Sequence, residues 1–342
     1  MHCIGAKLRV DNIGPHQFRL ERQRDAVVGE AAQRVLGREQ AAEAARRVFE
    51  RGLDRVPAIE EGEPVRVACM TEQAVGYNFG PVEAWPTITD TISRSLSVWS
   101  PGNGTISGLA WANLNPSPGV YNWTALDSWV ALCQKNHVEM VYTLCSPPAW
   151  AGGSNPDPAA YKSFMTALIN HVGNAIQYYE GYNEYNASSS IFSGSTSNLV
   201  ALQKVLYETV HQLSPTSLVL SPTYTGLGGQ PMTNFLNAGG GAYFDIAAMH
   251  GYVDVSGESI IQSFNNFKNA LVAGGAGNKP IWDTEWSWWP DSPPPQDVQA
   301  AFLSSSLILQ SALGVQREIY YAYDSIDHAR NHPQGYLLWR VV

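Results

Sequence analysis

Residues 176–186 read IQYYEGYNEYN, an apolar run that ends abruptly in polar residues. The run from Ile176 to Tyr182 has the length of a buried β-strand, and Asn183 and Glu184 follow it directly. The stretch KPIWDTEW at 279–286 repeats the pattern, with an apolar run that ends at Glu285. A carboxylate hemmed in by Tyr and Trp is costly to bury unless it is paired or used. The two stretches therefore predict strands that carry functional residues at their ends.

Six further apolar runs follow the same pattern from about Val75 onward, separated by segments with a single apolar stripe at helical spacing. Strands that alternate with helices are typical of βαβ units and a parallel sheet. We therefore expect an α/β fold, a (β/α)8 TIM barrel, with an open doubly wound sheet as the alternative. No GxGxxG motif follows the first run, which weakens a dinucleotide-binding version of that alternative. The expected strands are 75–79, 96–100, 139–144, 176–182, 218–221, 244–250, 280–285 and 318–323.

Composition divides the chain near residue 68. Residues 1–68 hold 12 of the 21 Lys and Arg residues but no Trp and no Tyr, although the chain has 11 and 16 of these. We expect 1–68 to be a separate charged segment and 69–342 to form the barrel domain. Residues 28–56 have the sparse apolar positions of a weakly amphipathic helix. Two interpretations of 1–68 stay open, namely an accessory helix and a misassigned start.

Charge and hydropathy exclude several classes of protein. A net charge of -9 and an isoelectric point near 5.3 argue against nucleic acid as a partner, since phosphate binding needs clustered Lys and Arg. No apolar run approaches the roughly 18 residues that a membrane span requires. The four cysteines are scattered, and we expect Cys133 and Cys145 to be buried thiols in neighbouring elements. The sequence leaves the oligomeric state open.

The two acidic residues suit one kind of chemistry. In a barrel, functional groups lie at the C-terminal ends of the strands, where Glu184 and Glu285 are expected. Two carboxyl groups about 5 to 5.5 Å apart can cleave a glycosidic bond with retention of configuration. Aromatic surroundings and a second carboxylate would help the acid to keep its proton. Taken singly, each residue could be a solvated carboxylate at a loop edge. Two such residues at strand ends of the same expected barrel favour a functional role.

Several motifs resemble those of known enzymes. The strings GYNEYN and WDTEW resemble the strand-four and strand-seven signatures of clan A glycoside hydrolases. Four further segments resemble family 39, the group of β-xylosidases and α-L-iduronidases: WANLNPSPGVYNWTALDSWV (111–130), YTLCSPPAWA (142–151), AAMHGY (247–252) and IYYAYD (319–324). The resemblance covers about residues 75 to 325. It implies a retaining glycosidase with a saccharide substrate and no metal or organic cofactor. It also implies a secreted or periplasmic location, although no signal peptide pattern is visible.

By this resemblance Glu184 would be the acid/base and Glu285 the nucleophile. Asn183 would contact the sugar 2-hydroxyl, while His250 and Tyr252 would orient the nucleophile and the sugar. His250 could equally be a structural histidine that closes a strand. Trp99 would be the aromatic residue of strand two. Aromatic rings pack well on the apolar face of a sugar, and the candidates for such walls are Trp150, Trp286 and Tyr323.

Three departures from the family pattern keep other functions open. Tyr185 stands where the family has proline, and Ser97 is expected in place of the arginine of strand two. The chain also ends at Val342, soon after the last expected strand, so we expect a barrel that is incomplete or divergent at its C-terminus. A catalytically inactive carbohydrate-binding barrel and a transglycosylase are the alternatives to a hydrolase. The sequence names neither the sugar and linkage nor internal or terminal cleavage.

Overall fold

The computed structural model describes residues 75–78, 92–97, 108–253, 258–287 and 296–321, and the fold is that of these residues. They form eight strands, each parallel to the neighbours with which it pairs. The strands are β1 (Val75–Asn78), β2 (Ile92–Arg94), β3 (Glu139–Leu144), β4 (Tyr178–Tyr182), β5 (Leu218–Leu220), β6 (Ala247–His250), β7 (Ile281–Trp286) and β8 (Val315–Tyr321).

The strands close into a ring. One ladder has the order β1-β8-β7-β6 and the other the order β2-β3-β4-β5. The ladders meet at two places, because β1 lies beside β2 and a parallel bridge joins Leu220 of β5 to Ile246 just before β6. The predicted TIM barrel is therefore confirmed, and the open sheet is not formed.

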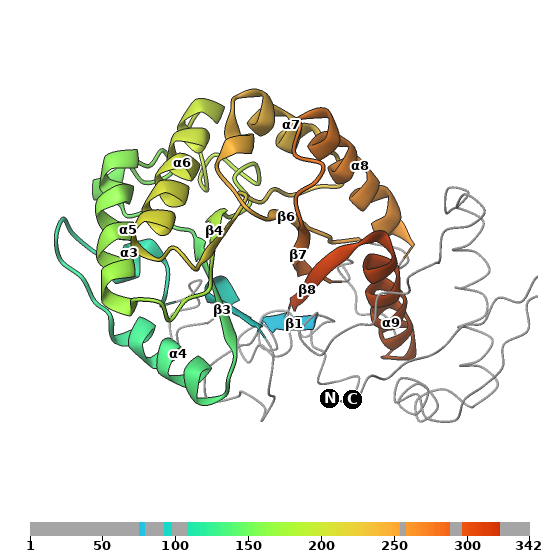
Figure 1. Ribbon diagram of the computed structural model, residues 1–342, viewed down its shortest axis with the longest axis horizontal. Coiled ribbons are helices and arrows are strands. Elements are labelled where there is room, and N and C mark those ends of the chain that lie inside the picture. Colours follow the sequence, from blue (N-terminus) through green and yellow to red (C-terminus); the bar gives the residue numbers. More distant parts are fainter. Residues whose placement is uncertain (1–74, 79–91, 98–107, 254–257, 288–295, 322–342) are drawn as a thin grey trace, which may run out of the picture.

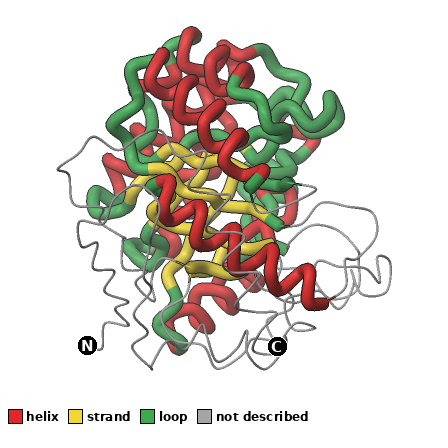
Figure 2. Tube along the Cα trace, turned by 90° about the vertical axis from the view of Figure 1, so that its right-hand side faces the viewer, coloured by secondary structure: helices red, strands yellow, loops and turns green. Residues whose placement is uncertain are grey.

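Helices surround this ring, as Figure 1 shows along the barrel and Figure 2 from the side. The α-helices are α3 (Trp111–Leu114), α4 (Thr124–Lys135), α5 (Pro158–Val172), α6 (Thr196–Leu213), α7 (Gln230–Asn237), α8 (Ser259–Ala273) and α9 (Gln296–Leu313). Short 3-10 turns, η2 (Ser95–Ser97), η3 (Ala149–Ala151) and η4 (Gly240–Ala242), complete the connections. The start of α5 was predictable, since the Asp157 side chain accepts hydrogen bonds from the backbone of Ala159 and Ala160, and Pro158 begins the helix.

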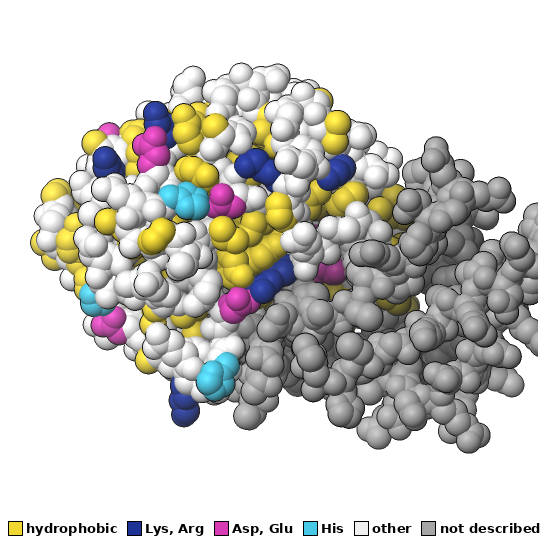
Figure 3. Space-filling view, in the orientation of Figure 1, with side chains coloured by type: hydrophobic (Ala, Val, Ile, Leu, Met, Phe, Trp, Pro, Cys, Tyr) yellow, Lys and Arg dark blue, Asp and Glu magenta, His cyan; other side chains and the backbone are white. Residues whose placement is uncertain are grey.

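The barrel interior is filled with side chains. Each strand from β2 to β8 contributes inward residues, and the buried ones are Ile92, Val141, Leu220, Ile246, Ala248, Trp282 and Ile319. Figure 3 shows apolar side chains gathered at the centre of one face, over the strands. Tyr178 packs edge-on against Trp282, and the guanidinium of Arg317 covers both rings. Arg317 also forms an ion pair with Glu139 at the start of β3, so the N-terminal end of the barrel is closed.

The larger core lies between the strands and the helices. The apolar stripe of α6 packs there as predicted, with Leu199, Leu202, Leu206 and Val210 buried. Cys133 on α4 and Cys145 after β3 are buried free thiols, which confirms the prediction for both.

The second strand was predicted wrongly. It spans Ile92–Arg94 instead of 96–100, and the other seven predicted strands overlap the observed ones. The true strand lacks an apolar run because only Ile92 faces the apolar barrel core. Ser93 accepts a hydrogen bond from Trp129, and Arg94 belongs to the site described below. The charged segment 1–68 lies outside the described residues. No helix in the described part of the chain is long and apolar enough to span a membrane.

Truncation of Ile319 should test the barrel core. The residue is fully buried among side chains from five other strands. Ile319→Ala should lower the free energy of unfolding by about 2 to 5 kcal/mol, because it leaves a cavity that the ring of strands cannot collapse to fill. Ile308→Ala on α9 is the matched control, since that side chain is 55% exposed, and it should change the free energy by less than about 0.5 kcal/mol. Urea denaturation of both variants measures the difference.

Candidate active site

A bulge lies in each of the two strands that were predicted to carry the acidic residues. In β4, Glu180 and Tyr182 pair with the successive residues Thr143 and Leu144 of β3, so one extra residue is inserted. In β7, Asp283 and Glu285 pair with the successive residues Met249 and His250 of β6. An inserted residue shifts the alternation of side chains and re-aims those that follow.

The bulge in β7 turns Glu285 toward the barrel axis. Trp282 lies in the inner core, so a regular strand would direct Thr284 inward and Glu285 toward the helices. Instead Trp286 faces the helix layer, where it packs against Phe302 of α9 and Tyr320 of β8. Glu285 itself reaches the side chains of Arg94 and Tyr252 at the barrel mouth.

The turn after β4 holds Glu184 in an uncommon backbone conformation. Glu184 has φ of 44°, in the left-handed region that costs a non-glycine residue of the order of 1 kcal/mol or more. Three hydrogen bonds from this turn to the segment after β5 compensate for it. The N–H of Glu184 donates to the Thr223 hydroxyl at 3.1 Å and the N–H of Tyr185 to the Thr223 carbonyl at 3.2 Å, and Asn186 accepts from the N–H of Thr225 at 2.7 Å. The acid is thus held on a fixed frame.

Arg94, at the end of β2, joins the parts of the site. Its guanidinium is fully buried and donates to Glu180 at 2.6 Å, to Glu285 at 2.5 Å and to the Asn183 side-chain oxygen at 2.7 Å. Burial alone lowers the pKa of Arg94, but the charges and hydrogen bonds of Glu180 and Glu285 outweigh it and raise the pKa above its ordinary value. The arginine is therefore permanently charged and fixed in place by two carboxylates.

Glu180 is a third carboxyl group in the site and lies within β4, earlier in the strand than the end that carries Glu184. It is fully buried, and its Oε2 accepts from Arg94 and from the Thr143 hydroxyl at 2.8 Å. An unpaired buried carboxylate costs several kcal/mol, so Glu180 and Arg94 depend on each other for their burial. Glu180 faces the guanidinium, and Glu285 meets the same guanidinium from another strand.

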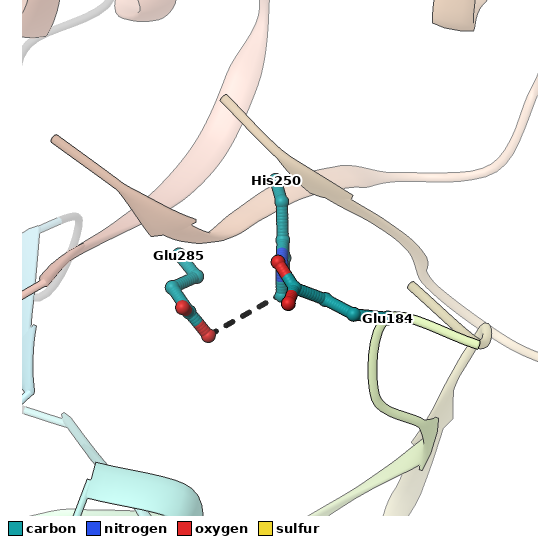
Figure 4. A group of neighbouring side chains, drawn as sticks. All are labelled: Glu184, His250 and Glu285. Atoms are coloured by element: carbon teal, nitrogen blue, oxygen red, sulfur yellow. Dashed lines mark hydrogen bonds and ion pairs between the residues drawn. The ribbon is translucent and has the colours of Figure 1, made fainter. Parts of the chain in front are cut away.

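His250, the last residue of β6, lies between the two predicted catalytic carboxylates (Figure 4). Its Nδ1 is 2.9 Å from Oε1 of Glu184, and its Nε2 is 3.4 Å from a guanidinium nitrogen of Arg94 and 3.8 Å from Oε2 of Glu285. Arginine can only donate, so in the neutral form of His250 a bond from Arg94 requires Nε2 to be the acceptor and places the imidazole proton on Nδ1, and in the charged form Nδ1 carries a proton as well. That proton is then donated to Oε1 of Glu184, which leaves Oε2 as the oxygen that can carry an exchangeable proton.

Two polar groups complete the immediate surroundings. The hydroxyl of Tyr252 donates to Oε1 of Glu285 at 2.6 Å, so both oxygens of Glu285 are held. Burial raises the pKa of the Tyr252 phenol well above its ordinary value, and the charge of Glu285 adds to this, so the phenol stays a donor. Asn183 uses its side-chain oxygen on Arg94, which leaves its amide N–H groups to donate to a ligand.

The acidity of Glu184 departs from expectation. Burial raises the pKa of Glu184, as predicted. The hydrogen bond and charge of His250 and the charge of Arg94 lower this pKa by more than burial raises it, so the net shift is downward. The aromatic surroundings that were expected to keep the acid protonated are outweighed by these two neighbours. A substrate that separates Glu184 from them would raise its pKa.

The remaining sequence predictions divide into four groups. The structure brings together Asn183, Glu184, His250, Tyr252 and Glu285. Trp286 was predicted to form a sugar wall, and this is wrong, because it is fully buried against the helices as a consequence of the bulge. Trp150 is partly exposed, with its indole N–H on the carbonyl of Asn115, and stays a candidate. Tyr323 and Trp99 lie outside the described residues.

The arginine that the sequence appeared to lack is present. Arg94 stands three residues before Ser97, on the correctly placed second strand, and so the prediction that Ser97 replaces it is wrong. Sequence reasoning also missed Glu180. Its signal was a single acidic residue inside the aromatic run YYEGY, at the same strand face as Tyr178. A lone charge within a buried strand indicates a buried partner.

Glu184, His250 and Glu285 also have the composition of a metal site, since one donor atom from each lies within 4.8 Å of the others. The electrostatics disfavour a cation there. Arg94 already contacts Glu285 and His250, so a metal ion would lie directly beside a buried guanidinium.

Comparison with known proteins bears on the family and on the fold. Residues 114–340 match the family model described as glycosyl hydrolase catalytic core. Among solved structures, a glucosidase from Croceicoccus marinus is 18% identical, with a TM-score of 0.54 over 84% of this chain and 60% of that one. A GH39 enzyme from Xanthomonas axonopodis pv. citri is 20% identical, with a TM-score of 0.50 over 60% and 48% of the two chains. Xylanase 10B from Thermotoga maritima is 12% identical, with a TM-score of 0.52 over 73% and 84%.

These likenesses bear on the fold, which is the same barrel. The chain spans 60% and 48% of the first two of those proteins. No curated protein matches the chain.

Replacement of His250 should raise the pKa of Glu184. In His250→Phe the hydrogen bond to Glu184 is lost while the ring shape is kept, so only the charge of Arg94 still opposes the effect of burial on the pKa of Glu184. Titration of carboxyl resonances in protein labelled with ¹³C at the Glu side chains should show an upward shift for Glu184. His211→Phe, which removes a histidine paired with Asp245 away from the site, should leave that titration unchanged.

Arg94 and Glu180 should be strongly coupled in stability. Arg94→Met removes the counter-charge of two buried carboxylates and should lower the free energy of unfolding by about 3 to 5 kcal/mol. The double variant Arg94→Met/Glu180→Gln should lose clearly less than the sum of the two single losses. Additive losses in urea denaturation would contradict the mutual dependence.

Proposed function

Because the chain belongs to the glycosyl hydrolase catalytic core family, we propose that it hydrolyses O-glycosidic bonds in a saccharide with net retention of configuration. The observation that carries this proposal is the close approach of two carboxyl groups from different strands. An oxygen of Glu184 and one of Glu285 lie within 4.8 Å of each other, with His250 between them. That spacing suits direct attack by one carboxylate, whereas an inverting enzyme needs about 6.5 to 9.5 Å between its carboxyl groups to admit a water molecule.

In the first step Glu285 attacks the anomeric carbon. Both of its oxygens are held by Arg94 and Tyr252, so it approaches with a fixed orientation. Glu184 transfers the proton from its Oε2 to the glycosidic oxygen, and the C–O bond breaks to release the leaving group as an alcohol. The sugar is then bound to Glu285 as a glycosyl ester.

In the second step Glu184 acts as the base. It removes a proton from water, the water oxygen attacks the anomeric carbon, and the ester bond breaks to release Glu285 as a carboxylate. The anomeric carbon is positively charged in both transition states. The site holds Glu180, Glu184 and Glu285 against a single Arg94, and this excess of acidic groups stabilises that charge.

Arg94 supports catalysis over a silent binding barrel, since the apparent lack of this arginine was one reason for the silent alternative. Tyr185 was the second reason. Its N–H donates to Thr223, a bond that proline cannot make, so the frame around the acid is built differently here. A transglycosylase uses the same first step with a sugar as the acceptor.

The solved structures of the same fold include a glucosidase and a xylanase. Aryl β-glucosides and β-xylosides are therefore the substrates to test first, followed by galactosides and iduronides. Analysis of the products distinguishes hydrolysis from transfer to a second sugar.

Substitution of the two acids should separate their roles. Glu285→Gln should abolish release of the aryl group, with a loss of at least about 10⁴-fold, because no ester can form. Glu184→Gln should still release a dinitrophenyl group in a single burst, since that leaving group needs no proton, and azide should restore turnover. Glu208→Gln, on an exposed part of α6, is the control. Full activity of both site variants would exclude the assignment, and NMR of the first-formed product anomer tests retention.

A further inference from the structure

Two more carboxyl groups are buried behind the site, and the proposed chemistry does not use them. Asp283 of β7 and Glu318 of β8 stand opposite each other in the strand register. Asp283 is fully buried and Glu318 is 3% exposed. Burial and the neighbouring Asp283 raise the pKa of Glu318 to about 9. Each group retains one oxygen without a hydrogen-bond partner among the described residues, Oδ2 of Asp283 and Oε2 of Glu318.

Asp283 sits at the base of the bulge that aims Glu285. Its Oδ1 accepts from the N–H of Gly251 at 3.0 Å. The Gly251 N–H is shared with the carbonyl of Glu285, also at 3.0 Å. The Gly251 N–H therefore links Asp283 and Glu285, on either side of the inserted residue, where the regular ladder is broken.

The neighbouring chain is shaped around this carboxyl group. A Cβ atom at Gly251 would lie 2.0 Å from Oδ2 of Asp283 and 2.7 Å from the Ile260 side chain of α8. Only glycine at position 251 leaves room for the carboxyl group in this place. Asp283 and Trp286 both face the helix layer although they are three positions apart, which is possible only with the bulge between them.

We infer that Asp283 is a positioning residue, which fixes the bulge of β7 by accepting a hydrogen bond from the backbone N–H of Gly251 and so aims the nucleophile at the barrel axis. This inference rests on the proposed function of Glu285. Asp283 touches no reacting atom and acts through the strand. Without this hydrogen bond, the regular alternation of β7 would direct Glu285 toward the helices and away from Arg94.

The charge of Asp283 is not what the bulge requires. Burial raises the pKa of Asp283 well above its ordinary value, the hydrogen bond from Gly251 lowers it less, and the charge of Glu285 raises it again. A neutral carboxyl group accepts hydrogen bonds through its carbonyl oxygen, as the asparagine amide does. Asparagine should therefore replace Asp283, whereas alanine should not.

The experiment compares Asp283→Asn and Asp283→Ala in the full chain. Asp283→Asn should keep kcat within about threefold of the unsubstituted protein. Asp283→Ala should lower kcat by about 100-fold with little change in KM, since displacement of a reacting group by about 1 Å has an effect of this size. Gly251→Ala is the second variant if Asp283→Ala does not fold, because its Cβ displaces the carboxyl group, and it should show the same loss.

Glu318→Gln is the matched control, since it removes the neighbouring buried carboxyl group and leaves the hydrogen bond between Asp283 and Gly251 in place. It should retain kcat and unfold at higher temperature than the unsubstituted protein at pH 8. The carboxyl group of Glu318 is protonated when folded but ionises on unfolding, so stability is lost as pH rises from about 4.5 to about 9.

Crystal structures of the variants separate this inference from the proposed function. In Asp283→Ala, or in Gly251→Ala, the contact between Glu285 and Arg94 should be lost, and in Asp283→Asn it should persist. An intact bulge in both disruptive variants, with the Glu285 contact kept, would overturn the inference whether or not any glycoside is cleaved. If the unsubstituted protein hydrolyses none of the glycosides, that result counts against the proposed function. The inference about Asp283 is then decided by the crystal structures alone.

Discussion

The buried charge of Arg94 is the constraint on which the site depends. A guanidinium with no solvent contact must be surrounded by acceptors, and here they come from β4, from β7 and from the turn after β4. Each acceptor is thereby fixed relative to the others, although the acceptors lie 86 to 191 positions from Arg94 in the chain. Electrostatic pairing at the barrel mouth thus fixes the positions of the polar side chains, as the apolar core fixes the positions of the strands.

Strand bulges translate this constraint into the positions of side chains. In a regular strand, residues that alternate in and out cannot bring both Trp282 and Glu285 to the inside. The inserted residue in β7 resolves this conflict, and the one in β4 brings Asn183 round to Arg94 in the same way. The bulge in β4 also requires glycine at position 181, since a Cβ atom there would lie 2.2 Å from the side chain of Gln203 of α6.

Much of this architecture was predictable from sequence. Seven strands could be located because each coincides with an apolar run, and the two acids because each ends such a run. The second strand could not be found in this way, since its short segment ISR carries a serine that bonds to Trp129 and an arginine that bonds to carboxylates. Trp286 was misassigned because a bulge leaves no mark in the hydropathy pattern. The effect of His250 on Glu184 depends on a 2.9 Å contact that only the folded chain creates.

Arg317, Tyr178 and Trp282 close the N-terminal end of the barrel, and this limits how small molecules can reach the site. In the proposed reaction, saccharide, departing alcohol and incoming water would therefore all use the opposite end of the barrel, where Glu184 and Glu285 lie. The alcohol and the water molecule that replaces it would pass through the same opening one after the other. A second sugar at that opening would have the same access to the site as water.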